Sequence, residues 1–135
     1  MRKTSFAIAI TGFSMLISPL PSLAHHSFMA EFDGRKPFTV TGVVTRIDWE
    51  NPHVFFYLDT KNEDGGIVKW SFQTATPIAL THRGWKRGTV KVGDRITVRA
   101  YLAKRGSNFA AARSVLMPDG QTVFTGSMDD GGPDQ

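Results

Sequence analysis

The stretch Thr76 to Trp85, TPIALTHRGW, is the part of the sequence that distinguishes one all-β fold from another. Thr76 followed by Pro77 is typical of a helix N-cap with a first-turn proline, and Gly84 is typical of a helix stop. We therefore expect a short helix over Pro77 to Arg83, after which Trp85 packs back onto the core. Strand-like sequence flanks this helix on both sides, so it lies in the middle of a β protein.

Three strands are expected before the helix. Phe38 to Trp49, FTVTGVVTRIDW, is rich in β-branched residues, and Gly42 in its middle is a candidate bulge or bend. His53 to Thr60 follows as a second strand with alternating faces. The Asp-Gly chemistry of Lys61 to Gly66 then predicts a hairpin loop leading to a third strand over Ile67 to Thr74.

Two further main strands are expected after the helix, over Arg95 to Ala103 and Ala110 to Met117, with a short strand over Gln121 to Phe124. Three strands, a helix and two strands, with a bent first strand, is the order of a five-stranded OB-fold-like Greek-key barrel. The alternative all-β fold is a small sandwich, which the single central helix disfavours.

The first 24 residues have the composition of an export signal. Arg2 and Lys3 precede an apolar run from Phe6 to Leu20, and Ser22-Leu23-Ala24 resembles a cleavage site. The run is shorter than the ~20 residues that span a bilayer. We expect cleavage after Ala24, a periplasmic protein without a membrane span, a barrel domain over 25–125 and a disordered tail over 126–135.

Composition limits the chemistry. The chain has no cysteine, which excludes disulfides and thiolate metal sites. The formal net charge is +4, and Arg2 and Lys3 contribute two of these charges, so a nucleic-acid partner is not indicated for the exported chain. The run from His82 to Lys91 nevertheless holds no acid before Asp94. It predicts either a basic face or an ordinary solvated helix end.

Several motifs as they stand here resemble a family of small exported bacterial proteins of unknown function. The most specific are the AHHSF start at Ala24 to Phe28, the tripeptide Asn51-Pro52-His53, and Gly84-Trp85. The resemblance covers nearly the whole mature chain. It implies a periplasmic OB-like domain, and it brings no activity, cofactor or catalytic residue with it.

Cleavage after Ala24 would leave a mature chain that begins with His25 and His26, beside a free α-amine. An amine and imidazoles are nitrogen donors suited to Cu(II), which has the highest affinity among the divalent first-row metals. A third nitrogen is expected from His53, at the start of the second strand, provided that Phe28 and Phe32 dock the terminus nearby. The alternative interpretation is a loose end and a histidine that bonds a backbone carbonyl.

A second hypothesis places the ligand on the barrel. OB-folds bind oligonucleotides or oligosaccharides on the face of strands two and three. Phe55 and Tyr57 would stack on a glycan, and Lys104 and Arg105 would meet its negative groups. The alternative is that these aromatics only fill the sheet surface.

Enzymatic motifs are absent from the sequence: there is no Gly-x-Ser-x-Gly, no His-Glu-x-x-His and no phosphate-binding loop. We therefore expect a non-catalytic binding or accessory protein. Copper is the first candidate ligand, and a glycan or a periplasmic protein partner is the alternative.

Overall fold

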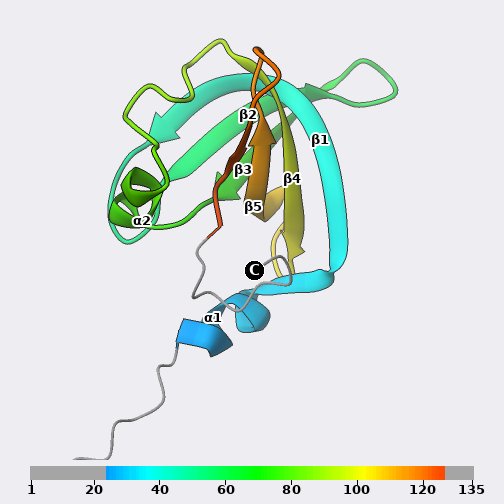
Figure 1. Ribbon diagram of the computed structural model, residues 1–135. Helices are drawn as coiled ribbons and strands as arrows, with labels where there is room; N and C mark the ends of the chain where they lie inside the picture. The colour runs from blue at the N-terminus through cyan, green and yellow to red at the C-terminus, as the bar shows by residue number, and fades with distance from the viewer. Residues whose placement is uncertain (1–23, 127–135) are drawn as a thin grey trace, which may run out of the picture.

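The computed structural model describes residues 24–126, with side chains from Phe28 onward. Residues 1–23 and 127–135, which hold nearly all of the predicted export signal and tail, lie outside the described residues. The elements are α1 (Ala24–Glu31), β1 (Phe32–Asp48), β2 (Phe55–Lys61), β3 (Ile67–Gln73), α2 (Pro77–His82), β4 (Arg95–Ala103), β5 (Phe109–Leu116) and β6 (Thr122–Phe124) (Figure 1).

The strands form a closed ring. β1 pairs antiparallel with both β2 and β4, β2 pairs with β3, and β4 pairs with β5. Parallel pairing of β3 with β5 closes the circle, and β6 adds to β5. With α2 between β3 and β4 in the sequence, this is the connectivity of the five-stranded Greek-key OB barrel. The predicted fold is confirmed.

β1 is longer than predicted. It begins at Phe32, six residues before the expected start at Phe38, because its first part pairs with the far end of β4, where Phe32 lies opposite Ala103. Further along, β1 moves from β4 to β2 at Val43, which faces a residue on each. A strand shared in this way must curve strongly, as Figure 1 shows.

Gly42 was predicted to be a bulge or a bend, and the bulge was wrong. The register of β1 against β2 shifts after Val44, whereas Gly42 pairs regularly with Ile96 of β4. Gly42 is required for a different reason, because a Cβ there would lie 2.7 Å from the Asp59 carbonyl oxygen. The glycine therefore allows β1 and β2 to approach closely, and it does not mark a bulge.

The main core fills the barrel with alternate residues of each strand. In β2, Phe56 and Leu58 point inward as the alternation predicts, and Trp85 packs back onto the core with its Nε1 donating to the Phe124 carbonyl oxygen at 3.0 Å. Trp70 is only partly buried and lies against Phe38, with ring centroids 5.0 Å apart. Trp85 is therefore part of the core, and Trp70 packs against it from a partly exposed position.

α2 follows the predicted capping chemistry. The Thr76 hydroxyl accepts a hydrogen bond from the Ala79 amide at 3.2 Å, and Pro77 is in the first turn. Gly84, with a φ of +87°, turns the chain after the helix. Within residues 24–126, no helix is long and apolar enough to cross a membrane.

A second, smaller core holds α1 against the barrel. Phe28 and Phe32 are buried with Tyr101 and Ala111, and the two phenylalanine rings lie 5.4 Å apart. The Tyr101 ring meets Phe28 edge-on at 6.0 Å. The expected role of Phe28 and Phe32 as anchors of the N-terminal segment is confirmed, and Figure 1 shows α1 at one end of the barrel.

Candidate functional site

His53 lies just before β2 and is half-buried. Its Nδ1 lies 2.9 Å from the carbonyl oxygen of Thr74. Because a carbonyl oxygen only accepts hydrogen bonds, Nδ1 must carry the proton in the neutral ring. The lone pair is then on Nε2, which is the ring nitrogen with the chemistry to bind a metal ion.

The backbone around this histidine is held on both sides. The Val54 amide donates to the Ala75 carbonyl at 3.1 Å, and the Thr74 amide donates back to the Val54 carbonyl at 2.9 Å. The Thr74 hydroxyl donates to the same Val54 oxygen at 2.8 Å. These bonds fix the Thr74 carbonyl, and through it the orientation of the His53 ring.

A cavity of about 110 Å³ lies beside His53. α1 supplies Phe28 and Glu31 to its wall. The remaining lining comes from β1, the end of β3 and the segment after it, β5, and the segment that follows β6: Phe32, Gln73, Thr74, Ala75, Ala111, Ala112, Arg113 and Gly126. The last turn of α1 and His53 therefore face one enclosed space.

The predicted metal ligands are only partly placed. His53 is in this cavity, whereas the side chains of His25 and His26 lie outside the described residues. In the sequence they precede Phe28 by three and two residues. Among the side chains that the structure describes, no group of three or more His, Cys, Asp or Glu could hold a metal ion.

Arg113 is a functional candidate that the sequence reasoning missed. It is buried, its guanidinium carbon lies 4.4 Å from the Phe28 ring centroid, and it lines the His53 cavity. A guanidinium over an aromatic face is attracted by the ring quadrupole. The signal was present, because Arg113 is the one charged residue in a strand of small and apolar side chains.

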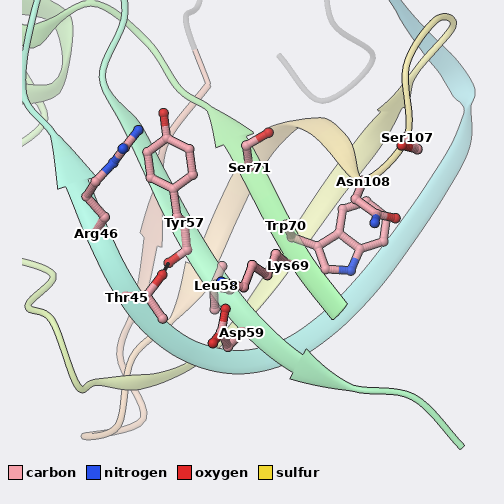
Figure 2. Close-up of a pocket in the computed structure, with 10 residues that line it drawn as sticks. All are labelled: Thr45, Arg46, Tyr57, Leu58, Asp59, Lys69, Trp70, Ser71, Ser107 and Asn108. Carbon is pink, nitrogen blue, oxygen red and sulfur yellow. Dashed lines mark hydrogen bonds between the residues drawn. The ribbon is translucent and has the colours of Figure 1, made fainter. Parts of the chain in front are cut away.

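A separate open groove of about 520 Å³ lies on the face of β2 and β3, flanked by β1 and the β4–β5 loop (Figure 2). Tyr57 and Trp70 are the aromatic residues that line it. The Tyr57 hydroxyl donates to Asp48 at 3.0 Å, and the Arg46 guanidinium carbon lies 3.9 Å from the ring centroid while Arg46 Nη2 donates to the same carboxylate at 2.7 Å. One face of the ring is therefore covered by Arg46.

The other predicted barrel-binding residues lie elsewhere. Phe55 stacks on Phe109 with ring centroids 6.3 Å apart, next to the second core. The Lys104 amide donates to the Glu31 carbonyl at 2.8 Å, and its Nζ donates to the carbonyl of Met29, so Lys104 supports α1. Arg105 is exposed in the β4–β5 loop. Of the four, only Tyr57 lines the groove.

Comparison with known proteins gives few matches. No curated protein matches the chain. Among solved structures, the chain is similar to Rim1, a mitochondrial single-stranded DNA binding protein from S. cerevisiae, with 9% sequence identity and a TM-score of 0.47. That similarity covers 70% of this chain and 98% of the other.

A match to a protein family covers most of the chain, over residues 14–112, and includes α1, the His53 segment and the barrel up to the middle of β5. The chain therefore belongs to the family of unknown function DUF6152.

Proposed function

We propose that this protein is an exported Cu(II)-binding protein, in which the terminus released by cleavage after Ala24 and the ring of His53 hold the ion. One observation carries the proposal: His53 and Phe28 line the same cavity, and His25 precedes Phe28 by only three residues. A terminus released by cleavage after Ala24 would thus be tethered by Phe28 next to the His53 ring.

The donor atoms suit Cu(II). His25 as the first residue would offer its amine and its ring, and His53 Nε2 would be the third nitrogen. The hydrogen bond from Nδ1 to the Thr74 carbonyl is the kind of contact that orients metal-binding histidines in proteins. His26 offers a second mode, through the amine, its own amide and its ring, which needs no contribution from His53.

The charges around the cavity contribute little to cation binding, so the type of donor atom determines which metal binds. The Arg113 guanidinium lines the cavity and repels a cation, whereas the Glu31 carboxylate in the same wall attracts one. Among the described lining residues there is thus one charge of each sign, and together these two give a cation little net attraction. Affinity in this proposal therefore comes from nitrogen coordination, which favours Cu(II) over hard cations that prefer oxygen.

The test is a Cu(II) titration followed by EPR on protein shown by mass to begin at His25. The same measurement is made on protein with one glycine added before His25 and on His53→Ala. His82→Ala is the matched control, because His82 is exposed at the end of α2. We expect one tightly bound Cu(II) with a three-nitrogen signal that is lost in His53→Ala and kept in the control. In the glycine-extended protein His26 becomes the third residue, so its ring, the amine and two amides should replace that signal with a four-nitrogen one.

Two results would contradict the shared site. Tight binding that survives His53→Ala but disappears in His26→Ala would mean that the terminus binds copper alone. Weak binding in every protein would remove copper from consideration. Isolation of uncleaved protein from a periplasmic fraction would contradict the free terminus itself.

The groove beside Tyr57 supports a second candidate, the binding of a glycan or a protein partner. Its position over β2 and β3 is where OB-folds hold extended ligands, and its lining is largely polar. Chitotetraose titrated into ¹⁵N-labelled protein should shift the amides of Tyr57 and Asn108. An unchanged spectrum at millimolar sugar would contradict glycan binding.

A further inference from the structure

A third hollow, independent of the two above, lies between the end of β1, the start of β2 and the segment that joins α2 to β4. Its floor consists of Val54, Phe56, Trp85 and Val90, each no more than 4% exposed. The volume is about 350 Å³, within the ~300–1,000 Å³ typical of small-molecule sites. None of its residues lines the His53 cavity or the groove.

The rim of this cleft is basic. Lys86, Arg87 and Lys91 are exposed around the apolar floor, and none of the described residues that line the cleft is acidic. Asp48 and Glu50 flank Trp49 in the chain; Asp48 accepts hydrogen bonds from Arg46 at 2.7 Å and Tyr57 at 3.0 Å, and Glu50 is exposed. Asp94 accepts a hydrogen bond from the Lys91 backbone amide at 2.9 Å. The basic run noted in the sequence is thus gathered at the mouth of an apolar hollow.

Arg87 is held at this mouth by a specific contact. Its Nη2 donates to the Trp49 carbonyl oxygen at 3.3 Å, and its guanidinium carbon lies 5.9 Å from the Trp49 ring centroid. Trp49 itself is half-buried in the cleft wall. A fixed cation next to an aromatic wall is well placed to meet an anionic group whose apolar part enters the cleft.

We propose that this cleft binds a free single-chain amphiphile with an anionic head, such as a long-chain carboxylate. The chain would lie against Phe56, Val54 and Trp85, where it would displace water from apolar surface. The head would remain at the mouth beside Lys86, Arg87 and Lys91. Charge complementarity selects this occupant. A purely apolar ligand would not interact electrostatically with the three cations, and a simple anion would not cover the apolar floor.

The affinity test uses dodecanoate and isothermal titration calorimetry. The charge variant is Lys86→Gln, Arg87→Gln, Lys91→Gln in one protein. The matched control is Lys61→Gln, Arg95→Gln, Arg105→Gln, which removes the same charge from exposed residues that do not line the cleft. We expect Kd to rise about tenfold in the first variant and less than about twofold in the control. Equal effects in both, or no binding of dodecanoate, would overturn the proposal.

The location test uses tryptophan emission. The chain has three tryptophans, and Trp49 and Trp85 both line the cleft. In Trp70→Phe protein, dodecanoate should therefore still shift the emission, and Val92→Asp at the exposed rim should weaken that shift. An emission shift that disappears in Trp70→Phe would place the ligand elsewhere and overturn the proposal.

Two further ligands test the role of the charged head and distinguish a free amphiphile from a membrane surface. Dodecyl maltoside carries an alkyl chain of nearly the same length with a neutral head and should bind at least about tenfold more weakly than dodecanoate. Equal affinity would remove the role of the cations. Binding to phosphatidylglycerol vesicles without binding to dodecanoate would mean a membrane surface and would overturn the free-amphiphile assignment.

Discussion

At Gly42 the backbone of β1 passes so close to β2 that a side chain does not fit. The added Cβ of Gly42→Ala would lie 2.7 Å from a backbone oxygen, which cannot rotate away. We expect a loss of about 2 kcal/mol in the free energy of unfolding, because two paired strands must separate. Urea denaturation measures it.

Gly66→Ala provides the comparison. Its Cβ would meet the Asn62 side chain at 3.1 Å in an exposed loop, and that side chain can move. Its effect should remain within about 0.5 kcal/mol. Equal losses in the two variants would show that close approach is not what Gly42 provides.

Asp33 gives the structure a pH dependence. The Arg35 amide donates to its carboxylate at 3.1 Å, and the Arg35 side chain and Lys36 lie nearby. This backbone hydrogen bond is the largest cause that holds the pKa of Asp33 below its usual value of 3.8. Burial opposes it, and the side-chain hydrogen bond from Arg35 and the charges of Arg35 and Lys36 lower the pKa further. A lowered pKa stabilises the folded state above the unfolded pKa, and the contribution disappears as the pH falls through the folded value.

The corresponding experiment compares Asp33→Asn with the unchanged protein. The variant should be the less stable protein at neutral pH, and the difference should shrink as the pH falls below 3.8 toward about 2. Thermal denaturation across this range provides the readout. A stability difference that is constant with pH would assign the effect to packing and not to ionisation.

At the scale of the elements, α1 is held against the barrel by contacts made at a distance along the chain. Its buried residue Phe28 meets Tyr101 of β4 and lies under the Arg113 guanidinium of β5. Lys104 adds two hydrogen bonds to the helix carbonyls. An eight-residue helix is marginal in water without such packing.

Phe28→Ala should therefore release α1 from the barrel. We expect a loss of about 3 kcal/mol from the removed ring, and faster hydrogen exchange throughout residues 24–31. Met29→Ala is the control, because Met29 is 45% exposed. If α1 exchanges at the same rate in both variants, Phe28 does not hold the helix.

At the scale of the whole molecule, residues 24–126 form at least three separate concave surfaces: the cavity under α1, the groove over β2 and β3, and the basic-rimmed cleft. Only the first joins α1 to the barrel. A ligand there links two parts of the molecule that otherwise separate by undocking of the helix, so it should stabilise the whole fold.

Copper is the direct test of this linkage under the proposed function. At a free Cu(II) concentration about 100 times Kd, binding contributes about 2.7 kcal/mol and should raise Tm by about 10 °C. EDTA should reverse the shift, and protein with one glycine before His25 should not show it. An equal rise in Tm in the glycine-extended protein would show that the stabilisation by metal does not depend on a terminus at His25.

Local patterns in the sequence were sufficient for much of the barrel. Alternation identified β2 and β3, and β4 was predicted with its exact bounds, Arg95–Ala103. The capping residue Thr76 identified α2. These features depend on side chains a few residues apart, so they can be recognised without knowing the fold. The order of the elements then predicted the barrel.

The beginning of β1 and the environment of His53 could not be found in this way. Phe32 belongs to β1 because it lies opposite Ala103 of β4. Arg113 of β5 contacts the ring of Phe28 in α1. His53 acquires its tautomer from Thr74, 21 residues later. Amphipathic patterns and caps are local, so the sequence alone determines them. Cavities, close approaches of strands and hydrogen bonds between distant segments arise only when closure of the barrel brings distant residues together.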